Sequence, residues 1–220
     1  MKRRRIYYKK WNLKISRELR DIIHGYIMSD GYIRKEGNLS VDQGVDQKKW
    51  VMWLFNKFEN LRATTLPREV IRKNKKNGKI TKSLRFFTRN LLHGFYNIWY
   101  KPIDSGSNNP VKQQKRLPKN ISCFFSPLFI SVWYAGDGTK IQGSLGAKFE
   151  VTSWTEEERL CLKKLFKQKY GINTLINRAG QSKLGRTQWT LNINASEYPK
   201  FKALITQYDL IPTLFPYKLH

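Results

Sequence analysis

The stretch Leu19–Tyr32, LRDIIHGYIMSDGY, decides how this chain folds. Its apolar pattern predicts a helix that runs from about Ser16 to Ser29. Apolar side chains cover too wide an arc for a surface helix, so this helix is expected to be buried on more than one side. Gly25 within it costs a helix about 1 kcal/mol relative to alanine. The close approach of a second helix backbone would account for a glycine at this position.

A carboxylate stands at the end of this helix and at the end of a second one. Asp30 follows the first helix, and Asp137 follows the apolar run Pro127–Thr139, PLFISVWYAGDGT. A negative charge at the C-terminal end of a helix is unfavourable unless a cation is near. Side-by-side packing of the helices would bring both carboxylates together, and oxygen ligands of this kind suit Mg²⁺. Metal ions held there can stabilise the attacking and leaving oxygens of phosphodiester cleavage.

The two acids belong to an internal duplication. They lie 107 residues apart, and each ends the first helix of the predicted order helix, β pair, helix, β pair, helix. Lys115 lies 85 residues after Asp30, and Lys218 lies 81 residues after Asp137. A single lysine is usually a solvated one, but the matched offsets make this pair candidates for stabilising developing negative charge. We therefore divide the chain into a basic arm (1–15), a first repeat (16–100), a linker (101–125) and a second repeat (126–220).

The composition indicates a folded protein that binds a polyanion. The 220 residues include 42 Lys and Arg against 16 Asp and Glu, so the formal net charge is +26. Aromatic residues make up 14% of the chain, which is too many for a disordered basic tail. Nucleic acid is favoured over a membrane surface as the partner. No apolar run approaches the roughly 20 residues that span a bilayer.

The cysteines and the first residues bear on the compartment. The chain has two cysteines, Cys123 and Cys161, and no CxxC pair, which argues against a zinc site and favours free thiols in a reducing compartment. The start, MKRRRIYYKKWN, lacks the apolar core of a secretory signal, so we expect a protein that is not secreted. The basic arm either lies on phosphates or is a frayed, solvated end.

The two acid-tipped segments carry a family resemblance. IHGYIMSDG (Ile23–Gly31) and ISVWYAGDG (Ile130–Gly138) resemble the paired motifs of the LAGLIDADG homing endonucleases in their single-chain form with two motifs. The tail, with Pro212 and Tyr217-Lys218-Leu219, is similar to that of an intron-encoded member. The resemblance implies an α+β monomer of two pseudo-symmetric αββαββα repeats. Saddle-shaped antiparallel sheets would lie in the DNA major groove, and the motif helices would pair at the interface.

The resemblance also implies an activity and its residues. It implies site-specific cleavage of both DNA strands across the minor groove, with Mg²⁺ or Mn²⁺, leaving short 3′ overhangs. The target would be long, pseudo-asymmetric double-stranded DNA, and the enzyme would act in an organelle or the bacterial cytoplasm. Asp30 and Asp137 become metal ligands, assisted by the backbone carbonyls of Ser29 and Gly136. Lys115 and Lys218 become the basic active-site residues.

The motifs depart from the family pattern at two positions, one of them only in the second motif. The close-contact glycine of the family is Gly25 in the first motif but Val132 in the second. The aspartate two residues before the catalytic one is replaced by Met28 in the first motif and by Ala135 in the second.

Polar residues of the predicted strands are candidates for contacting DNA. The lysine-rich stretch RKNKKNGK around an Asn-Gly turn predicts a basic hairpin tip suited to a DNA backbone or groove. Arg and Lys favour guanine and Gln favours adenine, although each of these residues could equally be a solvated strand residue. The candidates are Arg34, Lys35, Ser40, Asp42, Arg72, Lys73, Lys75, Lys76, Lys79, Arg85, Arg89, Lys148, Glu150, Arg178, Gln181, Lys183, Arg186 and Gln188.

Two residues at the end of the second predicted strand are candidates for supporting the first acid. Gln43 and Asp46 could hold the water network around Asp30. Asp46 also has the simpler interpretation of an N-cap for the following helix.

Two other functions remain open at this point. An RNA splicing maturase on the same fold, or an enzyme with both roles, is the main alternative, and intron RNA would then be a partner. A basic ribosomal or nucleoid protein is the third interpretation, but it gives no reason for two matched helix ends, SDG and GDG.

Overall fold

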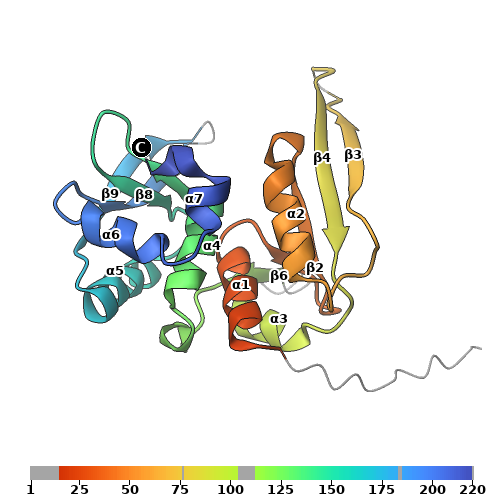
Figure 1. Ribbon diagram of the computed structural model, residues 1–220, viewed down its shortest axis with the longest axis horizontal. Helices are drawn as coiled ribbons and strands as arrows, with labels where there is room; N and C mark the ends of the chain where they lie inside the picture. Colours follow the sequence, from red (N-terminus) through yellow and green to blue (C-terminus); the bar gives the residue numbers. More distant parts are fainter. Residues whose placement is uncertain (1–14, 76, 104–111, 183–184, 220) are drawn as a thin grey trace, which may run out of the picture.

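A computed structural model describes residues 15–75, 77–103, 112–182 and 185–219 (Figure 1). The predicted α+β fold with two αββαββα repeats is confirmed. The first repeat comprises α1 (Arg17–Met28), β1 (Tyr32–Ile33), β2 (Leu39–Gly44), α2 (Lys48–Lys57), β3 (Arg68–Lys73), β4 (Ile80–Phe87) and α3 (His93–Trp99). The second comprises α4 (Pro127–Asp137), β7 (Gly138–Lys140), β8 (Ala147–Glu150), α5 (Glu156–Tyr170), β9 (Thr174–Gln181), β10 (Thr187–Ile193) and α6 (Tyr198–Ile205).

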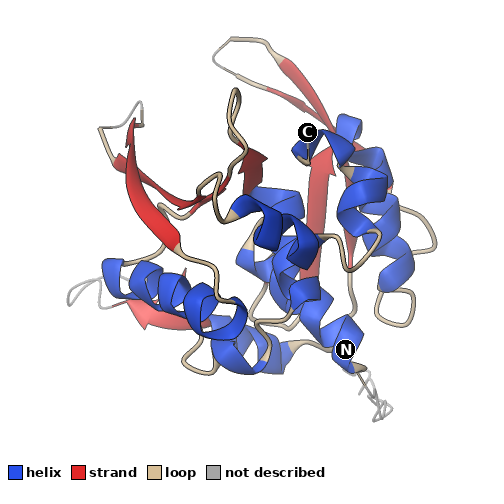
Figure 2. Ribbon diagram, turned by 60° about the vertical axis from the view of Figure 1, so that its left-hand side comes forward, coloured by secondary structure: helices blue, strands red, loops and turns tan. Residues whose placement is uncertain are grey.

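Each repeat builds one antiparallel four-stranded sheet with the same strand order. The first sheet has the order β1-β2-β4-β3, and the second has the order β7-β8-β10-β9. Residues opposite one another include Val41 with Phe86 in the first sheet and Phe149 with Leu191 in the second, and all four are buried. The core face of both sheets is therefore fixed by the period-two alternation of apolar residues. In Figure 2 helices lie between the strands of the two sheets.

Helices α1 and α4 pack directly against each other and join the two repeats. A Cβ atom placed on Gly25 would lie 2.6 Å from the carbonyl oxygen of Phe129 and 2.8 Å from Cβ of Val132. The glycine of one helix thus provides the space that the valine of the other fills. The departure at Val132 does not prevent close packing, and the buried apolar residues of both repeats form one continuous core.

Serine caps start both of these helices, and one cap also links them. The Oγ atoms of Ser16 and Ser126 accept hydrogen bonds from the backbone N–H of Leu19 and Phe129, each at 3.1 Å. The hydroxyl of Ser126 also donates to the buried carboxylate of Asp21 in α1, at 2.7 Å. This places a negative charge at the positive end of α4, which stabilises the pair of helices.

The longest helix has the ends that its sequence predicts. At the start of α5, Thr155 and Glu158 form a reciprocal capping box. At its end, Gly171 adopts the left-handed conformation, with φ of 65°. This covering helix is therefore set by local sequence as well as by packing.

Several details differ from the sequence-based expectations. Gln47, rather than Asp46, precedes α2, and no side chain caps that helix because the 3₁₀ turn η1 (Val45–Gln47) leads into it. The predicted linker contains an antiparallel pair, β5 (Tyr100–Ile103) with β6 (Lys112–Lys115), and the 3₁₀ turn η2 (Ile121–Cys123).

The C-terminal tail is also structured. It forms α7 (Leu210–Leu214) and the 3₁₀ turn η3 (Pro216–Lys218). Residues 1–14 of the predicted basic arm lie outside the described residues. Within the described part of the chain, no helix has the length and apolarity needed to cross a bilayer.

We predict that Gly25→Ala destabilises the protein. The added methyl group would press on the backbone of Phe129 and on Val132, so the helices must separate. Overpacking of this kind costs about 1–3 kcal/mol, measurable as a loss in the free energy of unfolding by chemical denaturation. Gly94 in α3 is the matched control because a Cβ there meets no atom within 4 Å. Gly94→Ala is expected to be neutral or stabilising by up to about 1 kcal/mol. Equal stability of the two variants would contradict the close helix contact.

Candidate active site at the paired helix ends

The C-terminal ends of α1 and α4 meet at the interface between the repeats. A Cβ placed on Gly136 would lie 2.6 Å from Oγ of Ser29 and 3.0 Å from Oδ2 of Asp30. The glycine that precedes one acid therefore touches the residues at the other helix end, and Asp30 and Asp137 share one site. Only a very small residue fits at position 136. The two predicted acids are thus brought together by the fold.

The electrostatics of Asp137 reflect this crowding. Burial and, next, the negative charge of Asp30 raise the pKa of its carboxyl to about 7. The positive charge of Lys115 opposes both effects. Asp30 is the more exposed acid of the two. A second negative charge is therefore costly here unless a cation compensates for it.

Each of the two predicted lysines donates hydrogen bonds to the carbonyl oxygens at one of the two helix ends. Lys115, at the end of β6, donates from Nζ to the carbonyl oxygens of Ile27 at 2.7 Å and Ser29 at 2.9 Å. These carbonyls belong to the last turn of α1, where no backbone N–H can reach them. The ammonium group also lies at the negative end of the helix dipole. Burial lowers the pKa of Lys115, and the charges of Asp137 and Asp30 oppose that shift.

The other lysine repeats this arrangement on α4. Lys218, in η3, is only 8% exposed and donates to the carbonyl oxygens of Tyr134 at 3.0 Å, Ala135 at 2.8 Å and Gly138 at 2.7 Å. Burial lowers its pKa to about 8, opposed by the charges of Asp137 and Asp30. The structured tail thus has a clear role, because η3 positions this lysine. A hollow of about 790 Å³ opens beside it, lined by residues that include Gly136, Lys148 and Tyr217.

Of the two predicted supporting residues, one reaches the first acid. Gln43 donates from Nε2 to Oδ2 of Asp30 at 3.0 Å and to the hydroxyl of Tyr26 at 3.3 Å. Asp46 is exposed in η1, and no hydrogen bond links it to Asp30. Gln43 is therefore the residue that orients this carboxylate.

The chemistry of the site fits a divalent cation. Two carboxylates of opposing helix ends lie together, and a cation between them would offset the repulsion that raises the pKa of Asp137. The carbonyl of Ser29, expected as a further ligand, already accepts the bond from Lys115 but has a second lone pair. Among the described residues, no cluster of three or more His, Cys, Asp or Glu is present, so an ion bound by the two carboxylates would need other oxygen ligands, such as backbone carbonyls or water.

The strand registers decide which candidate DNA-binding residues share one sheet face. In the first repeat Ser40, Asp42, Arg72 and Arg85 point away from the core, on the face opposite Val41 and Phe86. Arg68 lies directly opposite Arg85 on this face and was missed by the sequence analysis, although its place in the alternation could have revealed it.

Three of these side chains bind one another. Asp42 accepts hydrogen bonds from the guanidinium groups of Arg85, at 2.9 Å from Nε, and of Arg72. Burial alone would raise the pKa of Asp42, but hydrogen bonds from Ser83 and Arg85 and the charges of both arginines lower it. The acid therefore holds two guanidinium groups in place on the exposed face of the sheet.

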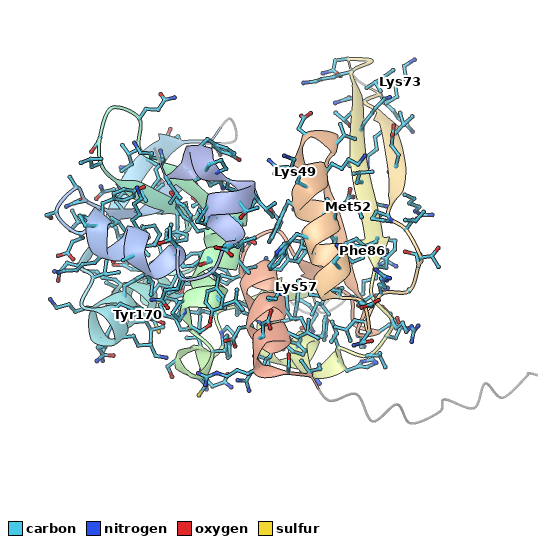
Figure 3. The ribbon with its side chains drawn as sticks, viewed as in Figure 1. Lys49, Met52, Lys57, Lys73, Phe86 and Tyr170 are labelled. Carbon is cyan, nitrogen blue, oxygen red and sulfur yellow. The ribbon has the colours of Figure 1, made fainter. Side chains whose placement is uncertain are left out.

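The rest of the first-repeat candidates are distributed around this face. Lys73 lies near the free end of the β3–β4 hairpin (Figure 3) and on the other side of the strand from Arg72. The exposed remainder is Arg34, Lys35, Lys75, Lys79 and Arg89. Lys76 lies outside the described residues.

The second sheet presents a face of the same kind but with fewer charges. Lys148, Glu150 and Gln188 lie on the side away from the core, together with the missed residues Thr190 and Asn192. Arg178 is not on this side. It shares the core-side face of the sheet with Ile176, two residues earlier in β9, but its side chain is exposed. Gln181 and Arg186 are exposed near the β9–β10 turn, and Lys183 lies outside the described residues.

Comparison with known proteins agrees with this architecture. Residues 20–201 match the model of the LAGLIDADG DNA endonuclease family. The chain is 27% identical over 207 residues to cytochrome b mRNA maturase bI2 of Saccharomyces cerevisiae, covering 90% of this chain but 46% of that protein. It is 24% identical over 219 residues to the protein of the same name from Debaryomyces hansenii, covering 95% of this chain and 76% of that one. The chain thus spans about half the length of the first relative and three quarters of the second.

Solved structures show the same fold. The homing endonuclease I-WcaI bound to its DNA recognition sequence has a TM-score of 0.74 and 18% identity, with 94% of this chain and 88% of that chain covered. Full-length DUF199/WhiA from Thermatoga maritima has a TM-score of 0.51 and 14% identity, with 94% and 63% covered. With the family model matched over most of its length, this chain belongs to the LAGLIDADG DNA endonuclease family.

Proposed function

We propose that this protein is a site-specific DNA endonuclease that cuts both strands of a long, pseudo-asymmetric target. The observation that carries the proposal is the pairing of Asp30 and Asp137 at the ends of α1 and α4, where half-buried Lys115 and buried Lys218 donate to the helix-end carbonyls. A purely structural interface has no reason to keep two repelling carboxylates and two desolvated ammonium groups together. Cleavage is proposed to occur across the minor groove and to leave short 3′ overhangs.

The residues of this chain divide the work between binding and catalysis. The basic exposed faces of the two sheets bind the DNA backbone and read base edges. Asp30 and Asp137 hold Mg²⁺ or Mn²⁺, which would activate water and stabilise the leaving oxygen of the phosphodiester. Lys115 and Lys218 place positive charge beside the scissile phosphates, where negative charge develops. The similarity to a DNA-bound homing endonuclease in fold supports this division.

A second function, RNA splicing as a maturase, is favoured by a separate observation. Both curated relatives are named cytochrome b mRNA maturases. The presence of both acids supports cleavage and is compatible with a protein that has both roles. These names also favour an intron-encoded protein in an organelle over one in a bacterium. We propose that the protein works as a monomer, since one chain supplies both repeats.

We predict that Asp30→Asn and Asp137→Asn each abolish double-strand cleavage while DNA binding persists. The change removes a metal-ligating charge but keeps the size of the side chain. The substrate is a plasmid that carries the joined exons flanking the intron of this reading frame, incubated with Mg²⁺. Gel shift in Ca²⁺ measures binding. Full cleavage by either variant would refute the shared metal site, and a wild-type protein that cuts no joined-exon plasmid would refute the proposed endonuclease.

We predict that the metal-free wild-type protein loses stability relative to Asp137→Asn as the pH rises from about 4 through 7, and that Mg²⁺ offsets this loss. The folded-state pKa of Asp137, about 7, lies above its ordinary value of 3.8. Its contribution to stability is therefore present at low pH and is lost as the carboxyl ionises. Mg²⁺ binds the ionised form and should raise Tm more at pH 7 than at pH 5.

The control for this prediction is Asp137→Asn. The asparagine does not ionise, so the difference in Tm between wild type and variant should change with pH in the sense just given. Thermal unfolding at several pH values, with and without Mg²⁺, measures it. A difference in Tm that is constant with pH would show that Asp137 ionises as an ordinary surface carboxyl.

For the second function, we predict that the protein accelerates excision of its own intron from a precursor transcript. The basic surface would bind the phosphates of folded intron RNA. Splicing of the labelled precursor is followed with and without protein, and Asp30→Asn tests whether the cleavage site is needed. Excision at the same rate in the presence and absence of protein would reject the maturase role and leave the endonuclease proposal untouched.

A further inference from the structure

The two halves of the active site can be aligned residue by residue from the strand registers. Two residues past each acid, Tyr32 pairs with Ser40 and Thr139 pairs with Lys148. Position 43 lies three residues beyond Ser40, and position 151 lies three residues beyond Lys148. The backbone N–H of Val151 donates to the carbonyl oxygen of Trp189 at 2.9 Å, which continues the ladder past β8. Gln43 of the first half therefore corresponds to Val151 of the second.

This equivalence exposes a chemical difference beside the two acids. Gln43 donates to the carboxylate of Asp30 and to the hydroxyl of Tyr26, four residues before that acid. Val151 has no polar side-chain atom and is fully buried. The residue four before Asp137 is Trp133, whose indole N–H favours the charged carboxylate of Asp137 but falls short of hydrogen-bonding geometry with any described acceptor. Asp30 is thus oriented by an amide from the sheet, and Asp137 is not.

We propose that Gln43 is a positioning residue for Asp30 alone, and that the two halves of the site therefore cut their DNA strands at unequal rates. This inference rests on the proposed endonuclease function. A hydrogen-bond partner behind a metal-ligating carboxylate fixes its rotamer before the metal and substrate arrive. The half that contains Asp30 has this partner, so the strand whose scissile phosphate it serves is cut first. Nicked DNA should then accumulate before the linear product.

The first test follows each strand separately. A duplex of the joined-exon sequence carries a different label on each strand, and wild-type protein should cut one strand several-fold faster than the other. Loss of a partner of this kind costs about 10–100-fold, so Gln43→Leu should slow that faster strand by this factor. The slower strand should keep its rate within about twofold. Gln168→Leu, an exposed glutamine of α5, is the matched control and should change neither rate.

The second test needs no cleavage. Calorimetry with Ca²⁺ on metal-free protein measures each half after the other acid has been removed. In the Asp137→Asn background, Gln43→Leu should weaken Ca²⁺ binding by about tenfold. In the Asp30→Asn background, the same substitution should leave Ca²⁺ affinity unchanged. A general folding defect would lower binding in both backgrounds.

The outcomes separate this inference from the function on which it rests. Equal strand rates in the wild-type protein, or equal slowing of both strands by Gln43→Leu, would overturn the inference while the endonuclease stands. A wild-type protein that cuts neither strand would overturn the proposed function, and the Ca²⁺ measurements would still decide whether Gln43 supports only Asp30.

Discussion

The contact between α1 and α4 is the constraint on which the rest of the molecule depends. Gly25 and Gly136 bring the helices close enough that their C-terminal ends share one site. The contact is not symmetric, because Val132 fills the space that Gly25 leaves. It nevertheless joins two similar repeats into one continuous core.

The site is built from opposed charges that are individually costly. Burial disfavours the ionised forms of Asp137, Lys115 and Lys218, and each lysine regains stability by donating to carbonyls at a helix end. The lysines therefore satisfy the terminal carbonyls of the helices and also place positive charge near the acids. Their positions come from two short elements outside the repeats, the strand β6 and the 3₁₀ turn η3.

The sequence predicted the features that arise from local pattern and from duplication. The repeat order, the two acids, both lysines and the caps at Thr155 and Gly171 all follow from spacing or from known cap chemistry. The strand pair in the linker did not, because β5 and β6 are stabilised by pairing across a long intervening segment. The cap role of Asp46 failed because a 3₁₀ turn displaces the helix start. The contact of Gln43 with Asp30 could be predicted from its position in the sequence. That Asp137 lacks an equivalent glutamine could be established only from the strand register.

The same register argument bears on how the sheets meet DNA. Asp42 binds two guanidinium groups on the exposed face of the first sheet, so Arg72 and Arg85 are ordered before any ligand arrives. Ordering long side chains in advance lowers the entropy cost of binding. The equivalent acid of the second sheet, Glu150, lies opposite Thr190, and no described cation forms an ion pair with it. One half of the protein therefore presents a preformed cationic surface and the other a more neutral one. Two such different surfaces would favour a DNA target whose two halves differ in sequence.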